Sequence, residues 1–467
     1  MSNSLENIDN IPWQVKKLED LNNQKLPVYF DVEDFEEIID YYMYQSHFRQ
    51  SLKVAEYACT VHPSSISLKL KVAQLLASVN KENHALEILS EVERLEPSNY
   101  EIFLTRGAIY SQLHKYEKAI EEYNKAAMES DEPDYVYCNI AFEYENMGNY
   151  DKTIEYLRKA LELNPENDLA MYEAAYCFDL LSLSQESIDF FSRLIDRHPY
   201  STEAWFNLGI SYINSELYEK ALESFEFALA IDPDHSAATF HCAYAYSLME
   251  KYHEAIEIYQ GLFEKEDQDS DAMIHYYIGE CYEKTEDYHN AKTHYQKATQ
   301  LNPEITDAWI GLGVCENESG NTHSAIKCIQ KGLEMDPENT AYLCILADIY
   351  FDEDMIEEGC HYYEKAIGTS PVEESLYIDY ADALAEKEEY KKAEETLVTG
   401  IEEINPTHGL YYRMAAMMYL QGKNKEAAFF LEEALSMDFD KHDAMLDQYP
   451  QLRNIPEIAN LINLYSN

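Results

Sequence analysis

The stretch WFNLGISY at residues 205–212 begins a pattern that returns about every 34 residues through most of this chain. It is followed by Ala221, Phe225, Ala228 and Pro233. Prolines recur on or near the same interval, at residues 63, 97, 165, 199, 233, 303, 337 and 371. Self-similarity at this period is typical of stacked small units that bury their apolar faces only against their neighbours. The sequence therefore predicts a repeat architecture and not a single globular core.

Small and apolar residues recur at fixed positions of the repeat. Positions 4, 7, 8 and 11 fall on one face of a first helix, and positions 20, 24 and 27 on one face of a second helix. Positions 8 and 20 hold small residues in nearly every unit, which lets two antiparallel helices approach closely. Proline at position 32 ends the second helix. Twelve units are expected, beginning at Val32, Ile66, Tyr100, Asp134, Asp168, Thr202, Ser236, Ala272, Thr306, Thr340, Glu374 and His408.

This pattern resembles the tetratricopeptide repeat (TPR) over roughly residues 32–441. The resemblance implies an all-α fold, a right-handed α-solenoid superhelix of helix pairs whose first helices line a concave channel. We expect an N-terminal arm or cap at 1–31, twelve repeats at 32–441 and C-terminal capping helices at 442–467. Inserted residues suggest hinges near 268–271 and 405–407.

Both ends of the stack need their outer apolar faces sealed. A short amphipathic helix starting at proline is expected from Pro456, Ile458, Leu461 and Ile462. An apolar strip near the N-terminus consists of Trp13, Val15, Leu18 and Leu21. Two interpretations of this strip remain open, a cap on the first repeat or a segment that docks in the protein's own groove.

The chain is strongly acidic, with 88 Asp and Glu residues against 35 Lys and Arg, a formal net charge of -53. Nucleic acid is excluded as a direct partner because its phosphates need cationic side chains. Anionic membrane surfaces are disfavoured for the same reason. The acidity is interpreted as a solvated outer face that keeps a long stack soluble, or alternatively as a means of attracting basic partners.

The N-terminus, the cysteines and one acidic run bear on compartment and metal binding. The N-terminus lacks a basic start and an apolar core, so a secretory signal is not indicated. Nine cysteines are scattered without a C-x-x-C pair, which favours neither disulfides nor zinc. We therefore expect a cytoplasmic protein. Asp267, Asp269 and Asp271 mimic the start of a calcium loop, but Ala272 replaces its turn glycine, so a solvated linker is preferred.

Positions 2, 5, 9, 12 and 13 lie beside the packing face of the first helix. In the TPR family these positions look into the concave channel. Aromatic side chains there suit a peptide-binding surface, although they also suit packing between adjacent first helices. Asparagines at position 6 suit hydrogen bonding to a peptide backbone. The expected peptide-binding residues are Asn139, Phe142, Tyr172, Tyr176, Phe206, Asn207, Ile210, Phe240, Tyr244 and Tyr276.

Carboxylates gather on or near the groove side of the tenth and eleventh repeats. They form an expected acidic groove, consisting of Asp348, Asp352, Asp379, Asp382 and Glu386. Lys71, Lys284 and Arg413 are too dispersed to clamp a terminal carboxylate. Apolar or aromatic and basic partner segments are therefore favoured.

No motif for catalysis, phosphate binding or metal binding is present, and neither enzymatic activity nor a cofactor is expected. The preferred hypothesis is a non-enzymatic scaffold that binds extended or helical segments of other proteins in its concave groove. The alternatives are a self-assembling structural scaffold, joined as a homo-oligomer through its own N-terminal segment or tail, and a regulatory subunit of a larger complex.

Overall fold

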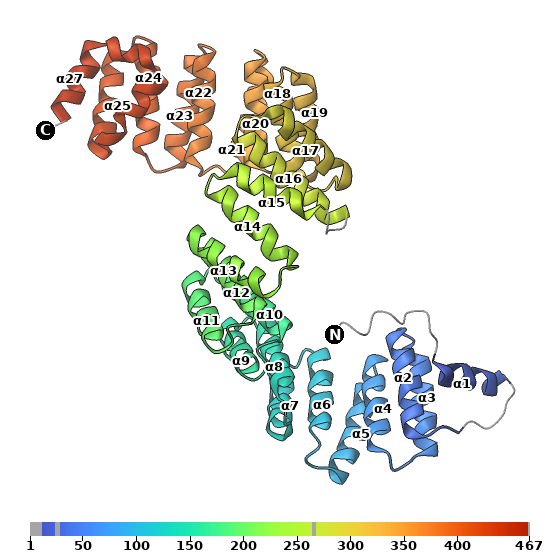
Figure 1. Ribbon diagram of the computed structural model, residues 1–467. Helices are drawn as coiled ribbons and strands as arrows, with labels where there is room; N and C mark the ends of the chain where they lie inside the picture. Colours follow the sequence, from blue (N-terminus) through green and yellow to red (C-terminus); the bar gives the residue numbers. More distant parts are fainter. Residues whose placement is uncertain (1–11, 24–28, 264–267, 466–467) are drawn as a thin grey trace. The chain divides into compact units, whose positions relative to one another are not determined.

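The computed structural model describes residues 12–23, 29–263 and 268–465. These residues form 27 α-helices and two short 3-10 helices, with no β-strand among them. Contacts divide the chain into two compact units, residues 1–238 and 239–467. Within each unit, helices that follow one another in sequence lie side by side as antiparallel pairs (Figure 1).

The first unit consists of one N-terminal helix and six helix pairs. These are α1 (Trp13–Asn23), α2 (Val32–Tyr44), α3 (Phe48–Val61), α4 (Ile66–Ser78), α5 (Glu82–Leu95), α6 (Tyr100–Gln112), α7 (Tyr116–Glu129), α8 (Asp134–Asn146), α9 (Tyr150–Leu163), α10 (Asp168–Leu180), α11 (Ser184–Arg197), α12 (Thr202–Ile213) and α13 (Tyr218–Ile231). The boundary between the units falls in the first turn of α14 (Ser236–Leu248).

The second unit continues the same alternation to the C-terminal segment. Its helices are α15 (Tyr252–Leu262), α16 (Gln268–Lys284), α17 (Tyr288–Leu301), α18 (Thr306–Glu318), α19 (Thr322–Met335), α20 (Thr340–Asp352), α21 (Ile356–Thr369), α22 (Glu374–Glu386), α23 (Tyr390–Glu403), α24 (His408–Leu420), α25 (Asn424–Met437), η1 (Phe439–Lys441), α26 (His442–Gln448), η2 (Pro450–Asn454) and α27 (Pro456–Tyr465). Even-numbered helices from α2 to α24 are first helices, and odd-numbered helices from α3 to α25 are second helices.

Each turn between a first and a second helix contains one residue with positive φ, always at position 15 of the repeat. The next residue donates its backbone N–H to the carbonyl at position 11, at 2.9 Å from Leu217 to Tyr212. This bond closes the end of the first helix. Three of these residues are glycines and nine are not: Ser46, Asn80, His114, Gly148, Ser182, Glu216, Glu250, Glu286, Gly320, Asp354, Glu388 and Gly422.

The small residues at position 8 allow large rings from the second helix to fill the interior of each pair. A Cβ atom added to Gly209 would overlap the ring of Phe225, and one added to Gly107 would lie 2.5 Å from the ring of Tyr123. Both rings are buried. In these repeats position 8 must be small, because the ring at position 24 of the second helix occupies the volume that a larger side chain at position 8 would need.

Both ends of the chain cover the repeats beside them. Val15 and Leu18 of α1 are buried in the same cluster as Phe35 of α2. The described part of this segment packs on the first repeat, as a cap would; the side chain of Leu21 lies outside the described residues. At the other end, Ile458 of α27 is buried in the cluster that contains Leu431 of α25.

Two features differ from what the repeat pattern suggests. Helix α16 begins at Gln268 and not at Ala272. The prediction of a linker at Asp269 and Asp271 is therefore wrong, because these residues extend the helix by one turn. Asp267 lies outside the described residues. Glu316, which replaces an aromatic residue at position 11, is buried, and Lys292 Nζ lies 2.8 Å from its carboxylate. That ion pair compensates the buried charge.

Candidate protein-binding surface

A row of exposed rings lies on the first helices of the fourth and fifth repeats. Phe142 of α8 is 55% exposed, and Tyr172 and Tyr176 of α10 are 68% and 45% exposed. Tyr135, one turn before Asn139 on α8, is 59% exposed. Spacings of four and three residues place Tyr135, Asn139 and Phe142 on one face of the helix. These four aromatic residues, Tyr135, Phe142, Tyr172 and Tyr176, are called the aromatic row below.

A cavity of about 320 Å³ adjoins the aromatic row. Tyr135 and Asn139 of α8 form part of its lining, together with residues of α4 and α6 such as Gln74, Leu104 and Gln112. Sequence reasoning missed these last three residues, although they occupy groove positions 9, 5 and 13 of the second and third repeats. Groove positions 5, 9 and 13 carry the same signal in these two repeats as in the later ones.

The two asparagines expected to read a peptide backbone have different environments. Asn139 is half-buried at the cavity, and its side-chain amide forms no hydrogen bond to another described residue. Asn207 is buried, and its amide donates to the backbone oxygen of Glu203 at 2.8 Å. Ile210 and Asn207 line only a small cavity of about 30 Å³. Asn139 is thus better placed than Asn207 to meet a ligand.

The remaining expected rings are half-buried and contact other rings. Phe206 lies 5.9 Å from Phe225 and 5.1 Å from His235, between ring centroids. Such tilted or edge-on ring pairs stabilise a core. For this residue the packing interpretation therefore explains the ring without a ligand.

A similar ring cluster occurs at the start of the second unit. Phe240 lies 5.3 Å from Tyr259, and Tyr244 lies 5.6 Å from Tyr277. Tyr276 lies 6.1 Å from Tyr295, and burial raises the pKa of its hydroxyl. Phe240, Tyr244 and Tyr276 therefore contribute to packing between helices of this unit.

The expected acidic groove is formed by side chains of α20 and α22 in the second unit. Asp348, Asp352, Asp379 and Glu386 are exposed. Desolvation by the surrounding protein raises the pKa of Asp348 to about 6, and the charges of Asp379, Asp352 and Glu386 add to the increase. The hydroxyl of Tyr363 donates a hydrogen bond of 2.5 Å to the carboxylate, which lowers the pKa and opposes this increase. This surface is suited to cations because its carboxylates repel one another.

Asp382 differs from the other four carboxylates, because its charge is already compensated within the protein. It is half-buried, and Arg413 Nε lies 2.9 Å from its Oδ2 atom. The hydroxyl of Tyr449 donates to its Oδ1 atom. Burial still raises the pKa of Asp382, although Arg413 opposes this increase.

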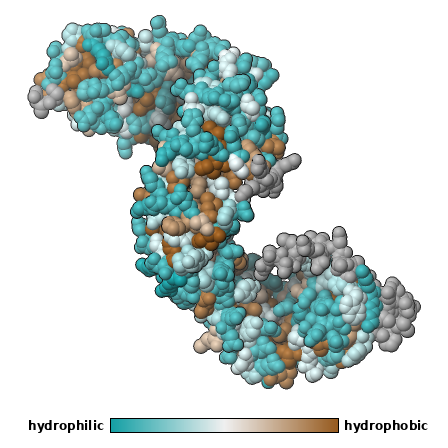
Figure 2. Space-filling model, viewed as in Figure 1, coloured by the Kyte–Doolittle hydropathy of each residue, from teal (hydrophilic) through white to brown (hydrophobic). Residues whose placement is uncertain are grey.

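The surface seen in Figure 2 is mostly hydrophilic, with scattered patches of hydrophobic side chains. Among the described residues, no group of three or more His, Cys, Asp or Glu side chains is arranged to hold a metal ion. No helix within the described ranges combines the length and apolarity needed to cross a membrane.

Comparison with known families identifies the repeat. One family model of the tetratricopeptide repeat matches residues 135–167, 202–235 and 272–305. A second model of the same repeat matches residues 100–130, 306–339 and 340–373. The chain thus contains tandem tetratricopeptide repeats, and its fold is a TPR solenoid built from helix pairs.

Three curated proteins illustrate the relatives. The chain is similar to the BBSome complex member BBS4 of Mus musculus, with 26% identity over 34% of this chain and 31% of that protein. It is similar to anaphase-promoting complex subunit 3 of Schizosaccharomyces pombe, with 29% identity over 19% of this chain and 12% of that protein. Superkiller protein 3 of the same organism matches with 33% identity over 18% of this chain and 5% of that protein. The matches thus span about a third or less of each relative.

Solved structures with the same repeat include yeast Tom70, with 14% identity, coverage of 92% of this chain and 98% of that chain, and a TM-score of 0.42. The Cut9–Hcn1 hetero-tetramer of the APC/C matches with 12% identity, coverage of 98% and 99%, and a TM-score of 0.37.

Proposed function

We propose that this chain is a non-enzymatic scaffold that binds extended or helical segments of partner proteins on the faces of its first helices. The observation that carries the proposal is the aromatic row on α8 and α10 beside the cavity of α4, α6 and α8. Much of each ring in the aromatic row is exposed to water and is not used in the packing of the repeats. Exposed rings of this kind commonly anchor protein interfaces.

Two curated relatives are named as members of multiprotein complexes, the BBSome and the anaphase-promoting complex. This supports a role for the chain as a subunit that organises other proteins. In the first unit the favoured ligand carries aromatic or aliphatic side chains. In the second unit the exposed carboxylates of α20 and α22 favour a basic segment. A cytoplasmic location remains part of this proposal.

The test uses the full chain with a photo-crosslinking residue at the position of Phe142. Partners crosslinked in the native cell are identified by mass spectrometry, purified and titrated against two double variants. Tyr172→Ala/Tyr176→Ala should weaken binding by at least ~10-fold for each ring lost, because interface anchors contribute about 2 kcal/mol or more. Its unfolding temperature should not change, since both side chains are exposed.

A matched control removes exposed rings from elsewhere. Tyr200 and Phe429 are 84% and 56% exposed and lie outside the aromatic row. The variant Tyr200→Ala/Phe429→Ala should bind as the unmodified chain does. Equal binding by all three proteins would contradict the proposed surface.

A further inference from the structure

The chain is poor in arginine, yet three of its arginines line a single cavity. It has eight arginines, and three of them, Arg158, Arg193 and Arg197, line a cavity of about 290 Å³ between α9 and α11. Both are second helices, so the cavity lies on the helix layer opposite to the aromatic row. The corresponding repeat positions, 25, 26 and 30, carry no arginine in any other repeat. We call this cavity the arginine pocket.

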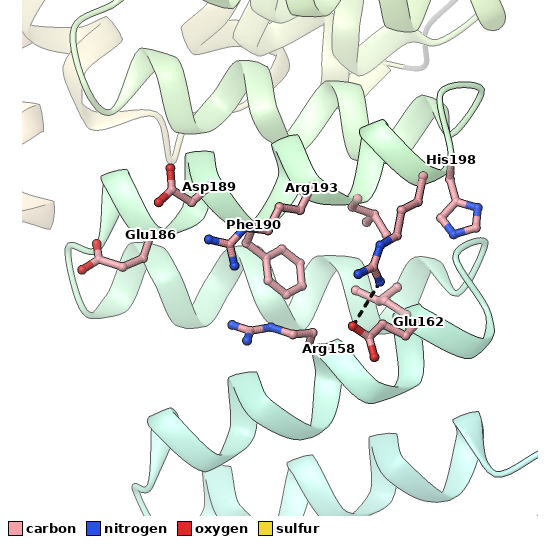
Figure 3. A pocket seen from close by; sticks show the side chains of 10 residues that line it. Arg158, Glu162, Glu186, Asp189, Phe190, Arg193 and His198 are labelled. Atoms are coloured by element: carbon pink, nitrogen blue, oxygen red, sulfur yellow. Dashed lines mark hydrogen bonds and ion pairs between the residues drawn. The ribbon is translucent and has the colours of Figure 1, made fainter.

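The floor of the arginine pocket is apolar. Leu161, Phe190 and Leu194 line it and are almost fully buried. The side chains of Arg158, Arg193 and Arg197 are exposed and line the pocket above this floor. Figure 3 shows Arg158 and Arg193 beside Phe190. The carbon of the Arg158 guanidinium lies 5.7 Å from the centroid of the Phe190 ring. The pocket therefore combines a hydrophobic floor with cationic walls.

Two of the arginines are not neutralised by the protein. Arg197 Nη1 lies 3.2 Å from Glu162 Oε1. Arg158 and Arg193, in contrast, form no ion pair with any residue in the described ranges, although Glu186 and Asp189 also line the cavity. Figure 3 shows both guanidinium groups close to the Phe190 ring. In a chain with 88 acidic residues, two neighbouring guanidinium groups without an ion pair to a described residue are unexpected.

The chemistry of these groups defines the ligand. A planar guanidinium pairs with both oxygens of a carboxylate, which a lysine ammonium does not do. An apolar floor accepts an aromatic or aliphatic side chain. The two guanidinium groups beside one floor thus match a segment in which acidic residues flank a large apolar residue.

We propose that the arginine pocket binds an acidic segment of a partner protein, with Phe or Leu on the apolar floor and flanking Glu or Asp carboxylates on Arg158 and Arg193. This site is separate from the first-helix surface and selects the opposite charge. The chain would therefore hold two chemically different segments on its two helix layers.

The test measures fluorescence polarisation of labelled peptides with the full chain. It is run near physiological ionic strength, where a screening length of about 8 Å limits repulsion by the overall negative charge. The probe is Gly-Ser-Glu-Phe-Glu-Ser-Gly. Its matched peptides replace both Glu by Gln, replace Phe by Ala, or replace both Glu by phosphoserine.

The Glu-Phe-Glu peptide should bind at least ~10-fold more tightly than the Gln and Ala peptides, as expected for charge-assisted hydrogen bonds and a buried ring. Arg158→Ala/Arg193→Ala should remove this preference. The control Lys331→Ala/Lys365→Ala, which removes two cations at position 26 of other repeats, should retain it. Far-UV circular dichroism should be equal for all three proteins, because the mutated side chains are exposed or half-exposed.

Three results would overturn the proposal: equal binding of the Glu and Gln peptides, binding unaffected by the arginine double variant, or binding of the phosphoserine peptide alone. Self-association that disappears in the arginine double variant would replace the partner by a second copy of the chain and would also overturn it. None of these results bears on the aromatic row, whose variants are different.

Discussion

Arg413 Nε lies 2.9 Å from Asp382 Oδ2 and joins the first helices of the last two repeats, α22 and α24. Tyr449, at the end of α26, donates its hydroxyl to the other oxygen of the same carboxylate. One acidic residue therefore connects two repeats and the C-terminal segment. Both side chains of the ion pair are largely shielded from water, at 16% and 14% exposure.

Replacing Arg413 by Met should destabilise the C-terminal repeats, because the Asp382 carboxylate would remain shielded and uncompensated. We expect a loss of about 1–3 kcal/mol, below the full value for a completely buried pair because some exposure remains. Urea unfolding, combined with hydrogen exchange of the α22 and α24 amides, measures the change. Arg413→Met/Asp382→Asn should recover part of the loss.

The exposed pair Lys391–Glu395, with 3.8 Å between Nζ and Oε1, provides a control. Lys391→Met should change stability by less than about 0.5 kcal/mol. A loss as large as that of Arg413→Met would mean that general charge balance, and not the specific pair, determines the result.

The left-handed residue at position 15 offers a second prediction. Glu216 has a φ of 58°, a conformation that glycine adopts with less strain. Glu216→Gly should raise the free energy of unfolding by roughly 0.5–1 kcal/mol, because relief of strain exceeds the added freedom of the unfolded chain. Thermal unfolding of the full chain would detect this increase.

The converse substitution has the opposite expected sign. Gly320 has a φ of 76° and nothing near the position of an added Cβ, so Gly320→Ala introduces backbone strain alone. It should lower stability by about 1 kcal/mol or more. If both substitutions shifted stability in the same direction, backbone conformation would not be the cause.

Much of the fold followed from periodicity, because the repeat positions determine which residues face the partner helix. Eleven first helices begin at the residue expected from the repeat register, and only α16 starts earlier. The N-terminal and C-terminal boundaries of the repeat region remain predictions, as do the hinges. The repeat pattern does not predict how exposed the residues at the edge of the packing face are.

Tyr172 and Phe206 illustrate this limit. Both occupy position 5, yet Tyr172 is 68% exposed and Phe206 is half-buried. The ring of His235, at position 34, lies 5.1 Å from Phe206, whereas the same position in the preceding repeat is Ser201, which has no ring. Whether an edge residue is available to a ligand thus depends on side chains elsewhere in the repeat. Comparing one repeat position across the units leaves these other side chains out.

A third prediction concerns Asp348, whose pKa is raised to about 6 chiefly by desolvation. A carboxyl with a raised pKa in the folded state loses stability as pH rises from about 4 to about 6. Asp348→Asn should therefore stabilise the second unit at pH 8, by up to about 1 kcal/mol after solvent screening, and have no effect below pH ~3.5. The hydroxyl of Tyr363 retains an oxygen acceptor in this variant.

Urea unfolding at pH 8 and pH ~3.5 tests this sign, with the exposed residue Glu432 as control. Glu432→Gln should have little effect at either pH. The same Asp348→Asn variant should weaken binding of basic peptides if the acidic groove binds them. Destabilisation at pH 8 would show that the carboxylate is stabilised by its surroundings, contrary to this argument.

The last prediction concerns His275 and His294, whose Nδ1 atoms lie 3.0 Å apart in the second unit. Burial lowers the pKa of each imidazole to about 4, with further contributions from Lys297 and, for His275, from His294. Since the unfolded chain binds these protons near pH 6.5, stability should fall as pH drops from about 6.5 to about 4 and level off below. From pH 7 to pH 5 we expect a loss of about 1–2 kcal/mol per histidine.

His294→Gln should reduce this pH dependence by about half in urea unfolding followed across the pH range. His361→Gln, at an exposed position of α21, should leave the dependence unchanged. An unaltered slope in His294→Gln would mean that other groups determine the acid sensitivity of this unit.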